Sequence, residues 1–464
     1  MFENIACLIL AAGKGTRMYS EDPKVLRPLL GHPMLYYVYR ALEPIFGEDI
    51  LTVVGFGRER MEKAFPEKID RFVMQEKQLG TGHAFSCSFD ALKATGAEYC
   101  LVMNGDTPLA LTETLEDFLD DTMASQADIA FLSLTLDDPG AYGRVIRGKN
   151  DSVQAIIELK DYDVHVHGPE TGEINSGIYL LRLDAVAPLL KELSNENKSG
   201  EYYITDLIGL GVKHGLRVDG IACGSDEFLL GVNSPRELLE AELVLQQFIN
   251  ETLVDKGVIL RNPGQVRIGP DVIVAPGVDI TGPCEIYGTT EIRQGAIVES
   301  NVVILDSLLD KRSHVRSFSH LEKAVLGESA VAGPFARLRP GAVLKENVRV
   351  GNFVEVKKSV LAKGVKAGHL TYLGDADIGE NTNIGAGTIT CNYDGKNKHK
   401  TIIGKEAFIG SNTAFVAPVK IGDQTLVGAG SVITKDVDAH ALAVGRSRQV
   451  NLKRRKCNDE SGPS

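Results

Sequence analysis

Short apolar runs alternate with amphipathic segments through the first half of the chain. Each run is five or six residues long and almost continuously apolar, which predicts buried strands at residues 5–10, 50–54, 99–103 and 129–134. Segments with apolar residues at helical spacing separate these runs, as at residues 112–124. Buried strands that alternate with helices are typical of a mainly parallel sheet with helices on both faces. We therefore expect a Rossmann-like α/β domain over residues 1–232.

A long helix is predicted after this domain. Ser234-Pro235-Arg236-Glu237 forms a capping box with proline at the first helical position. The residues that follow place apolar side chains on one face of the helix, at Leu238, Ala241, Leu245, Ile249 and Leu253. We interpret residues 233–256 as a linker helix that joins two domains.

After Gly257 the apolar period becomes six residues. A second tract with this period runs from Leu326 to Val356 and a third from Ile403 to Ile433. Such a period suits neither one helix nor one hairpin, so it predicts a β-solenoid over residues 257–450 whose coils stack about 4.8 Å apart around a continuous core. The first tract is aliphatic at every sixth position, at Ile268, Val274, Ile280, Ile286, Ile292, Val298 and Ile304.

The solenoid pattern resembles the left-handed parallel β-helix of hexapeptide acyltransferases. In that fold three hexapeptides make one triangular turn, and the left hand is what the resemblance implies. An interior filled by aliphatic side chains leaves no room for a substrate. We therefore expect ligands to bind on the outside or between subunits, and the chain to form a homotrimer.

Composition and charge exclude several functions. The formal net charge of −12 over 464 residues argues against a broad nucleic-acid surface. No apolar run approaches the 18 residues of a membrane span, and the first residues lack the positive charge of a signal peptide. Seven cysteines without a CxxC pair indicate reduced thiols in a cytoplasm. We expect small-molecule substrates, with no nucleic acid and no membrane as partners.

A glycine-rich string follows the first predicted strand. It reads Leu10-Ala11-Ala12-Gly13-Lys14-Gly15-Thr16-Arg17-Met18, with Pro23-Lys24 just beyond it. Glycines let backbone N–H groups close around phosphates, and the cationic side chains of Arg17 and Lys24 can neutralise phosphate charge. A lone glycine-rich turn is an ordinary connection between a strand and a helix, so the argument rests on the full string.

Two further groups stand near the ends of predicted strands. Gln75 and Gln78-Leu79-Gly80-Thr81-Gly82 follow an apolar strand and look like the base-recognition loop of sugar-nucleotide pyrophosphorylases. This resemblance implies that a side-chain amide reads the donors and acceptors of a uracil edge. Gly105-Asp106 closes the strand at residues 99–103, and such folds bind ligands at the carboxyl ends of their strands. We interpret Asp106 as a magnesium ligand, because Mg²⁺ prefers hard oxygen donors. A plain turn residue is the alternative.

The glycine-rich string resembles the signature of sugar-nucleotide pyrophosphorylases. Further matches follow in order along the chain: Tyr142-Gly143-Arg144, Glu158, Asn175-Ser176-Gly177, Tyr203-Ile204-Thr205-Asp206 and Gly231-Val232-Asn233. The resemblance implies that Asn233 is the second ligand of Mg²⁺, with Mn²⁺ or Co²⁺ as possible substitutes, and Asn233 can also cap the following helix. It places the sugar phosphate against Gly143, Glu158, Asn175 and Thr205.

The residues that this resemblance assigns to UTP and the sugar nucleotide are Leu10, Ala11, Ala12, Gly13, Lys24, Gln75, Gly80, Thr81, Asn104, Gly105, Asp106, Gly143, Glu158, Asn175, Thr205 and Asn233. Two positions depart from the commonest version of the signature. Asn104 stands where tyrosine often precedes Gly-Asp, and Ser176 replaces threonine. The first departure leaves the details of nucleotide contact open.

The solenoid carries a second group of chemically capable residues. They stand in Arg337-Leu338-Arg339-Pro340-Gly341, Ala367-Gly368-His369-Leu370-Thr371-Tyr372 and Cys391-Asn392-Tyr393-Asp394-Gly395. The six-residue register falters between Val360 and Ile378, which predicts an irregular coil at His369. It falters again at residues 396–400, where we expect a charged loop to leave the wall. A histidine with a pKa near ~6.5 can accept the proton of an amine that attacks a thioester.

From about Ile5 to Gly445 these motifs resemble the family of bifunctional N-acetylglucosamine-1-phosphate uridylyltransferase/glucosamine-1-phosphate acetyltransferases. The resemblance implies that His369 is the general base of acetyl transfer, and that Arg17 and Lys24 act in uridylyl transfer. It implies that glucosamine 1-phosphate binds Arg339, Lys357, Tyr372, Asn383 and Lys398. The set implied for the co-substrate acetyl-CoA is Ala386, Asn392, Tyr393, Ser411, Ala429 and Arg446.

Two alternatives remain at this stage. A single-activity sugar-nucleotide pyrophosphorylase with a non-catalytic, oligomerising or regulatory β-helix would leave His369 without a role. A non-catalytic binding subunit would be expected to lack Arg17, Lys24 or Asp106, and all three are present. Residues 451–464 include Lys453-Arg454-Arg455-Lys456, which we interpret as a basic, mobile tail.

Overall fold

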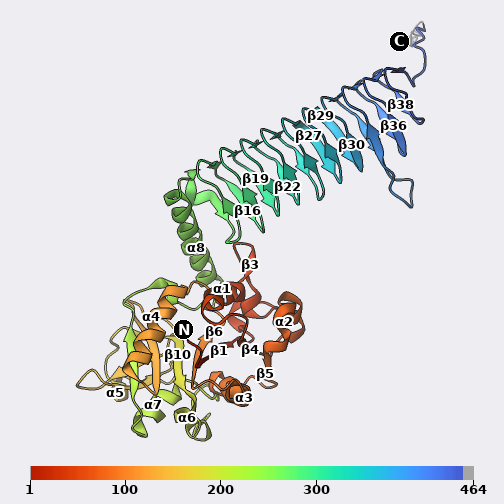
Figure 1. The fold of residues 1–464 in the computed structure, drawn as a ribbon. Helices are drawn as coiled ribbons and strands as arrows, with labels where there is room; N and C mark the ends of the chain where they lie inside the picture. Colours follow the sequence, from red (N-terminus) through yellow and green to blue (C-terminus); the bar gives the residue numbers. More distant parts are fainter. Residues whose placement is uncertain (1, 453–464) are drawn as a thin grey trace, which may run out of the picture. The chain divides into compact units, whose positions relative to one another are not determined.

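A computed structural model describes residues 2–452 of the chain (Figure 1). The chain divides into two compact units between Leu245 and Gln246, inside the long helix α8 (Pro235–Asp255). The predicted basic tail lies almost entirely outside the described residues. Within residues 2–452, no helix combines the length and the apolar character that a membrane crossing requires.

The first unit contains a mainly parallel sheet in the order β11-β7-β10-β6-β1-β4-β5. Strand β10 runs antiparallel to both β6 and β7, and β8 and β9 form an antiparallel extension beside it. The four predicted strands correspond to β1, β4, β6 and β7. The strands are β1 (Ile5–Leu10), β4 (Ile50–Val54), β5 (Phe72–Met74), β6 (Tyr99–Asn104), β7 (Ile129–Thr135), β8 (Arg144–Arg147), β9 (Val153–Ile157), β10 (Glu173–Arg182) and β11 (Val218–Ala222), with a separate hairpin of β2 (Pro28–Leu29) and β3 (His32–Pro33).

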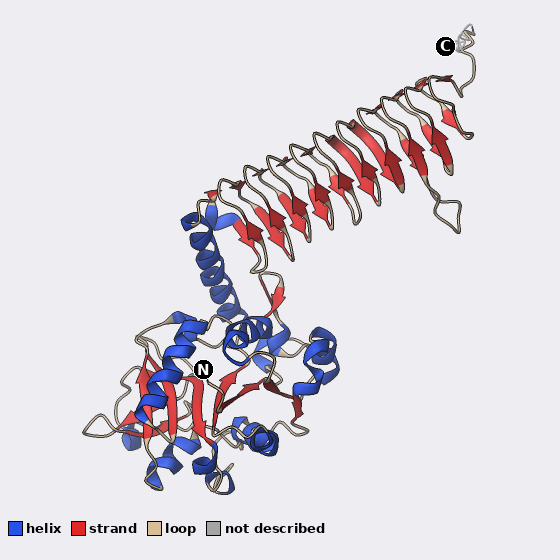
Figure 2. Ribbon diagram, viewed as in Figure 1, coloured by secondary structure: helices blue, strands red, loops and turns tan. Residues whose placement is uncertain are grey.

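Helices cover both faces of this sheet (Figure 2). The α-helices are α1 (Met34–Phe46), α2 (Arg58–Ala64), α3 (Thr81–Ala94), α4 (Thr112–Ser125), α5 (Val164–His167), α6 (Leu183–Val186) and α7 (Asp206–Lys213). Short 3₁₀ helices occur at η1 (Thr16–Met18), η2 (Lys24–Leu26), η3 (Pro66–Arg71), η4 (Leu189–Lys191) and η5 (Glu227–Leu229), and at η6 (Pro263–Gln265) in the second unit.

Strand β1 explains why two layers of helices are needed. Its side chains alternate between the faces of the sheet. Ile9 packs in one core with Leu35 of α1 and Phe118 of α4, whereas Leu8 packs in the other with Phe85 of α3. Both faces of this strand are apolar and buried, so each requires its own cover of helices. The α/β prediction for this unit is therefore confirmed.

The capping box forms as predicted at the start of α8. The Ser234 hydroxyl accepts the Glu237 backbone N–H at 3.3 Å, and the Glu237 carboxylate accepts the Ser234 N–H at 3.1 Å. In the second unit, Asn250 donates to the carbonyl oxygens of Pro263 and Val266 at 2.9 and 3.1 Å. These bonds hold the end of the helix against the first coil of the solenoid.

The second unit is a parallel β-solenoid. Successive coils pair in parallel, with Ile268 opposite Ile286 and Ile286 opposite Ile304. An offset of eighteen residues is three hexapeptides, so the predicted repeat is confirmed. The predicted aliphatic positions of the first tract are all buried in one continuous core, together with those of the second and third tracts. That core fills the interior of the solenoid with side chains.

The solenoid strands form two sheets. The longer sheet contains β12 (Ile259–Arg261), β13 (Val266–Ile268), β15 (Asp279–Thr281), β16 (Cys284–Tyr287), β18 (Ile297–Val298), β19 (Val302–Leu305), β21 (His314–Val315), β22 (His320–Glu322), β24 (Val331–Ala332), β25 (Arg337–Leu338), β27 (Arg349–Lys357), β29 (Lys366–Gly374), β31 (Asn383–Ile384), β32 (Ile389–Cys391), β34 (Phe408–Ile409), β35 (Ala414–Val416), β37 (Leu426–Val427), β38 (Val432–Ile433) and β39 (Leu442–Ala443). The shorter sheet contains β14 (Ile273–Val274), β17 (Glu291–Ile292), β20 (Leu308–Leu309), β23 (Val325–Leu326), β26 (Val343–Leu344), β28 (Val360–Leu361), β30 (Ala376–Ile378), β33 (Thr401–Ile403) and β36 (Val419–Ile421).

Of the two predicted interruptions of the repeat, the second has a distinct structural counterpart. Val356 pairs with Leu373, so the coil that carries His369 has seventeen residues, a length shared by earlier coils such as the one from Leu309 to Leu326. His369 itself lies in the continuous strand β29, opposite Asn352. The second interruption is a hairpin over residues 392–400 that projects from the wall beside β36 (Figure 1).

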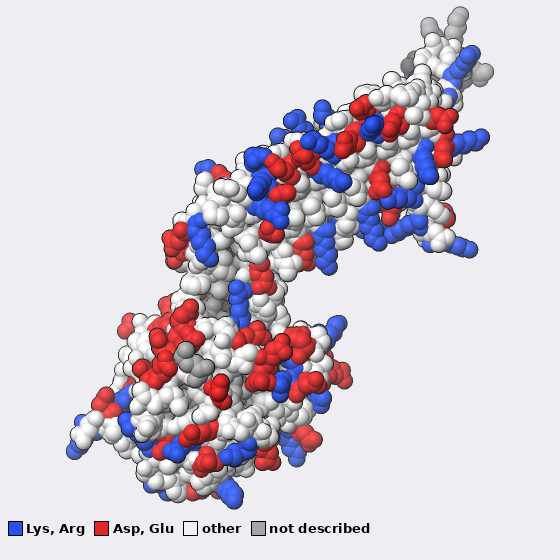
Figure 3. Space-filling view, viewed as in Figure 1, with Lys and Arg blue, Asp and Glu red and all other residues white. Residues whose placement is uncertain are grey.

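Charged side chains of both signs are interspersed over the visible face of the solenoid (Figure 3). Several form ion pairs between neighbouring coils: Arg261 with Asp279 at 2.8 Å, Arg293 with Asp310 at 3.3 Å and Lys363 with Glu346 at 2.9 Å. Exposed pairs of this kind contribute little stability each. The aliphatic interior therefore supplies most of the stability of this unit.

We expect Ile9→Ala to lower the free energy of unfolding of the first unit by about 3 kcal/mol, because it empties a fully buried position in the core. Ile69→Ala is the matched control, since Ile69 is 41% exposed, and its cost should stay below about 1 kcal/mol. Urea unfolding followed by circular dichroism measures both. Equal losses for the two variants would contradict the assignment of Ile9 to the core.

Candidate functional site

Backbone hydrogen bonds fix the glycine-rich string after β1 against its neighbouring strands. The Ala11 N–H donates to the Val53 carbonyl at 3.0 Å, and the Gly105 N–H donates to the Leu10 carbonyl at 2.9 Å. Leu10, Ala11 and Ala12 are buried, whereas Gly13 and Lys14 are exposed. The string therefore leaves the sheet at the carboxyl ends of β1 and β6, as the sequence predicts.

Four predicted residues meet at this end of the sheet. The Lys24 ammonium donates to the Asp106 carboxylate, and also to Asn233 Oδ1 at 2.9 Å. The Arg17 guanidinium donates to the same Asn233 oxygen at 3.1 Å. The backbone closes the arrangement, because the Val232 N–H donates to the Asp106 carbonyl at 2.8 Å. Two cationic side chains and two side chains with oxygen atoms that could bind a metal thus lie in one small cluster. We call it the cation cluster (Arg17, Lys24, Asp106 and Asn233).

The donors of the cation cluster suit a hard divalent cation. The Asp106 carboxylate and the Asn233 amide oxygen already converge on one positive charge, the Lys24 ammonium. Magnesium commonly takes one or two protein oxygens and completes its shell with water and phosphate. In keeping with this, the described residues contain no cluster of three or more His, Cys, Asp or Glu side chains that could hold a metal by themselves. The helix is capped by Ser234, so the side chain of Asn233 remains directed to the cluster.

The predicted base-recognition loop is held rigidly by its own contacts. The Gln75 side-chain amide donates to the Gly80 carbonyl at 3.1 Å and lies 3.0 Å from His83 Nδ1. Gly80 has a φ of +108°, and a Cβ there would approach the Tyr202 nitrogen to 2.9 Å. Only glycine therefore allows this loop to lie against the segment around Tyr202. The Thr81 hydroxyl completes the contact by accepting the Ile204 N–H at 3.0 Å.

The residues predicted for the sugar phosphate form two linked pairs. The Asn175 N–H donates to the Gly143 carbonyl at 2.9 Å. The Thr205 hydroxyl donates to the Glu158 carboxylate at 3.0 Å. Burial raises the pKa of the Glu158 carboxyl above its ordinary value. Burial and the nearby Glu158 carboxylate likewise raise the pKa of Asp206 to about 6.

Asn104, which departs from the common signature, has a local structural explanation. It ends strand β6, and its side chain packs against Gly177, whose φ is +83°. A Cβ at Gly177 would overlap the Asn104 amide. Asn104 and Gly177 are thus fitted to each other. Ser176, the second departure, is buried and donates to the Leu132 carbonyl at 2.9 Å.

His369 stands on the outer wall of the solenoid with an exposed side chain. Its Nδ1 lies 2.6 Å from the Asn352 side-chain oxygen, one coil earlier. Because that oxygen accepts, Nδ1 carries the proton and Nε2 is the basic nitrogen. The hydrogen bond also fixes the plane of the imidazole. His369 is therefore oriented as an exposed base.

The residues predicted for glucosamine 1-phosphate are only partly brought together. Lys357 and Lys398 lie side by side, and the Lys398 ammonium lowers the pKa of Lys357 below its ordinary value. Arg339 forms an ion pair with Glu355 at 2.8 Å. Glu355 lies in the coil before Tyr372 and directly opposite it. Asn383 is separate from this group, because it pairs with Lys366 and Phe408 in a different column.

The residues predicted for acetyl-CoA lie mostly along one corner of the solenoid. The Asn412 N–H donates to the Ala386 carbonyl, and the Gly430 N–H donates to the Ser411 carbonyl, both at 2.7 Å. The Arg446 guanidinium donates to the Ala429 carbonyl at 2.5 Å. Asn392 and Tyr393 are on the projecting hairpin, apart from this column. Ser411, Ala429 and Arg446 are exposed along this corner.

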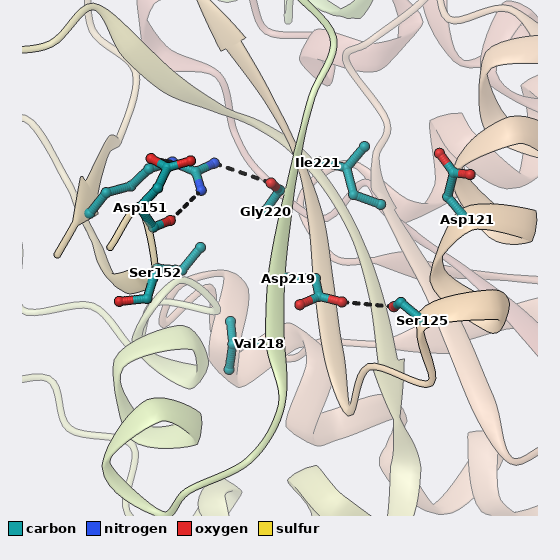
Figure 4. A pocket seen from close by; sticks show the side chains of 10 residues that line it. Asp121, Ser125, Asp151, Ser152, Val218, Asp219, Gly220 and Ile221 are labelled. Carbon is teal, nitrogen blue, oxygen red and sulfur yellow. Dashed lines mark hydrogen bonds and ion pairs between the residues drawn. The ribbon is translucent and has the colours of Figure 1, made fainter. Parts of the chain in front are cut away.

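A shallow pocket of about 480 Å³ lies elsewhere in the first unit, beside the edge strand β11 (Figure 4). Several of its polar groups are already engaged: Ser125 donates to Asp219 at 2.7 Å, and Arg147 forms two 2.7 Å bonds with Glu173 and one with the Gly220 carbonyl. None of the residues predicted to bind substrate lines it. We assign it no role in the reaction.

The sequence analysis missed three residues that orient predicted site residues. Asn352 holds His369, Glu355 holds Arg339, and Asp375 accepts a hydrogen bond from Asn392. Each lies sixteen or seventeen residues from its partner, which is one coil of the solenoid. A step of one coil, backward from His369 and Asn392 and forward from Arg339, would have identified them.

Comparisons with known proteins agree with both units. A family model for a MobA-like NTP transferase domain matches residues 7–153, and a model for six bacterial transferase hexapeptide repeats matches residues 400–435. Bifunctional protein GlmU of Oleidesulfovibrio alaskensis is 58% identical over 447 residues, which cover 96% of this chain and 97% of that protein. Proteins of the same name from Lawsonia intracellularis and Acinetobacter baumannii are 46% and 42% identical, covering 97% and 96% of this chain and 98% and 96% of those proteins.

These matches confirm the predicted fold class, a nucleotidyltransferase domain followed by a left-handed β-helix of hexapeptide repeats. They also confirm the predicted resemblance, because the identity extends over almost the whole chain. The chain is a transferase that belongs to the GlmU family of bifunctional enzymes.

Proposed function

We propose that the chain catalyses two consecutive steps of UDP-N-acetylglucosamine synthesis, one in each unit. The solenoid acetylates glucosamine 1-phosphate with acetyl-CoA. The first unit then transfers uridylyl from UTP to N-acetylglucosamine 1-phosphate and releases pyrophosphate. Membership of the GlmU family supports both activities. The observation that carries the bifunctional assignment is His369, an exposed imidazole oriented by Asn352 in a chain that also has the cation cluster.

In the acetyl step, the sugar amine attacks the thioester carbonyl carbon of acetyl-CoA. His369 Nε2 accepts the amine proton as the C–N bond forms and the C–S bond breaks. The departing CoA sulfur takes a proton from the resulting imidazolium. Asn352 keeps the imidazole in the required tautomer, and Lys357, Lys398 and Arg339 bind the sugar phosphate.

In the uridylyl step, a phosphate oxygen of the sugar attacks the α-phosphorus of UTP in line, and pyrophosphate leaves. Binding of both reactants in one cleft supplies much of the rate enhancement. Lys24 and Arg17 stabilise the charge that develops on the phosphates. Asp106 and Asn233 would hold Mg²⁺, which neutralises triphosphate charge when bound. Gln75 and Gly80 would face the uracil, and Glu158 and Thr205 the sugar.

Three further proposals complete this assignment. We propose functional boundaries at residues 1–232, 233–256 and 257–450. We propose a homotrimer, because the filled interior of the solenoid leaves only the outer surface and the junctions between subunits for ligands. Asn383, which belongs to a different column from Lys357 and Lys398, would then complete one site with them across a subunit junction. The cytoplasmic location remains a prediction.

His369→Ala should lower the rate of CoA release from acetyl-CoA and glucosamine 1-phosphate by at least about 10²-fold, because general-base catalysis is lost. Pyrophosphate release from UTP should stay at the wild-type rate. His320→Ala, an exposed histidine on another coil, is the matched control. Wild-type CoA release by the His369 variant would favour the single-activity alternative.

Asp106→Asn should have the reverse effect. Pyrophosphate release should fall by at least about 10²-fold, because the variant loses a charged oxygen ligand and the partner of Lys24. CoA release should be unchanged, and Asp117→Asn on the exposed face of α4 serves as the control. Loss of both activities from this substitution would contradict two separate sites.

Chelation separates the activities without mutation. EDTA should abolish pyrophosphate release and leave CoA release unaffected, because the oxygen donors proposed to hold Mg²⁺, Asp106 and Asn233, lie in the first unit and the proposed acetyl transfer uses no metal. Excess Mg²⁺ should restore the lost activity. Full uridylyl transfer in a chelated, metal-free solution would remove the assigned role of Asp106 and Asn233.

A further inference from the structure

The hairpin over residues 392–400 is the feature that the mechanism uses but does not explain. We call it the lysine hairpin, because it carries Lys396, Lys398 and Lys400. Its two arms pair between Tyr393 and Lys398, and the His399 N–H donates to the Asn392 carbonyl at 2.8 Å. Blue side chains gather where it projects from the wall in Figure 3. A short, exposed and highly charged hairpin needs a specific reason to keep one shape.

The base of the lysine hairpin is fixed to the preceding coil. The Asn392 side chain donates to the Asp375 carboxylate, and Lys400 pairs with Asp377 at 2.5 Å. Both aspartates belong to the wall next to strand β30. These contacts hold the two ends of the hairpin, but neither reaches its tip.

The tip is organised by one carboxylate. Asp394 accepts the backbone N–H groups of Lys396 and Asn397 at 2.8 and 2.7 Å through one oxygen. Its other oxygen lies 2.6 Å from His399 Nε2 on the opposite arm. The backbone N–H of Asn397, followed by the His399 ring, holds the pKa of Asp394 well below its ordinary value. Asp394 is thus a charged clamp that joins both arms to the turn between them.

The clamp has a consequence for Lys398, which directly precedes His399. The Asp375 N–H donates to the Lys357 carbonyl at 3.0 Å, and the Asp375 carboxylate accepts the Asn392 side chain, so the base of the hairpin is fixed beside Lys357. The Lys398 ammonium on this hairpin lowers the pKa of Lys357 below its ordinary value. Two like charges in contact repel, so a free loop would carry Lys398 away from the wall. The rigid hairpin prevents this and keeps a pair of ammonium groups ready for an anion.

We propose that Asp394 is a positioning residue of the acetyl-transfer reaction: it fixes the lysine hairpin so that Lys398 stands beside Lys357 and binds the phosphate of the amino sugar. This rests on the proposed function of the solenoid. Asp394 touches neither reactant and acts only through Lys398. Removing Asp394 lets the hairpin open, so that Lys398 no longer joins Lys357 and Arg339 at the phosphate.

A double-mutant cycle tests this coupling. Asp394→Ala should raise KM for glucosamine 1-phosphate about tenfold in acetyl transfer, with kcat within about twofold of wild type. In a Lys398→Ala background the same substitution should raise KM by less than about twofold, because the residue through which it acts is gone. A further rise of threefold or more in that background, or a wild-type KM for Asp394→Ala alone, would overturn the proposal.

Two other variants separate positioning from general damage. Asp394→Asn keeps an oxygen for the turn N–H groups and should recover at least half of the lost affinity. Asp438→Ala, an exposed aspartate elsewhere on the solenoid, should keep the wild-type KM. Pyrophosphate release by the first unit reports that each variant is folded, and it should be unchanged throughout.

A second measurement does not depend on the proposed activity. Trypsin cleaves after lysine in mobile segments, so limited proteolysis should cut the lysine hairpin at least fivefold faster in Asp394→Ala than in wild type or Asp438→Ala. Unchanged cleavage would overturn the clamp itself. If the wild-type protein does not acetylate glucosamine 1-phosphate, the proposed function fails, whereas the proteolysis result still decides whether Asp394 orders the hairpin.

Discussion

Parallel pairing of strands is the constraint on which both units depend. In the first unit it brings the carboxyl ends of β1 and β6 to one edge of the sheet, where the glycine-rich string and Asp106 emerge together. In the solenoid it places residues about eighteen positions apart directly above one another, so that Asn352 lies opposite His369. The same backbone geometry thus assembles two chemically different groups of side chains.

The spacing of apolar residues predicted the parts of the structure that repeat along the chain. The six-residue period gave the solenoid and its buried positions, and apolar runs gave the strands of the sheet. Contacts between distant segments do not follow from spacing. Lys24 and Asn233 are 209 positions apart and meet because the chain returns from β11 to the end of the sheet, so only the resemblance indicated that Asn233 belongs to this site. The contact of Asn352 with His369 is different. The two residues are one coil apart, so the repeat length alone is enough to predict that they lie side by side.

Cations of both predicted sites are paired with carboxylates. Lys24 faces Asp106 and Arg339 faces Glu355, so these cations are held in place by partners that the phosphates of the proposed substrates would displace or supplement. The partly buried carboxyls of Glu158 and Asp206, on the side of the first unit proposed to bind the sugar, are different, since they lie near each other with raised pKa values. A sugar hydroxyl can donate a hydrogen bond to such carboxylates, which a phosphate oxygen cannot do.

The coil that carries the lysine hairpin is twenty-five residues long, as the pairing of Ala376 with Thr401 shows, and yet the ladder continues on both sides of it. The solenoid therefore accepts seven additional residues at a corner without losing its register. Corners of the solenoid are therefore positions at which evolution can lengthen a segment, shorten it or change its charge without altering the fold. Substrate choice and architecture can then change independently in such enzymes.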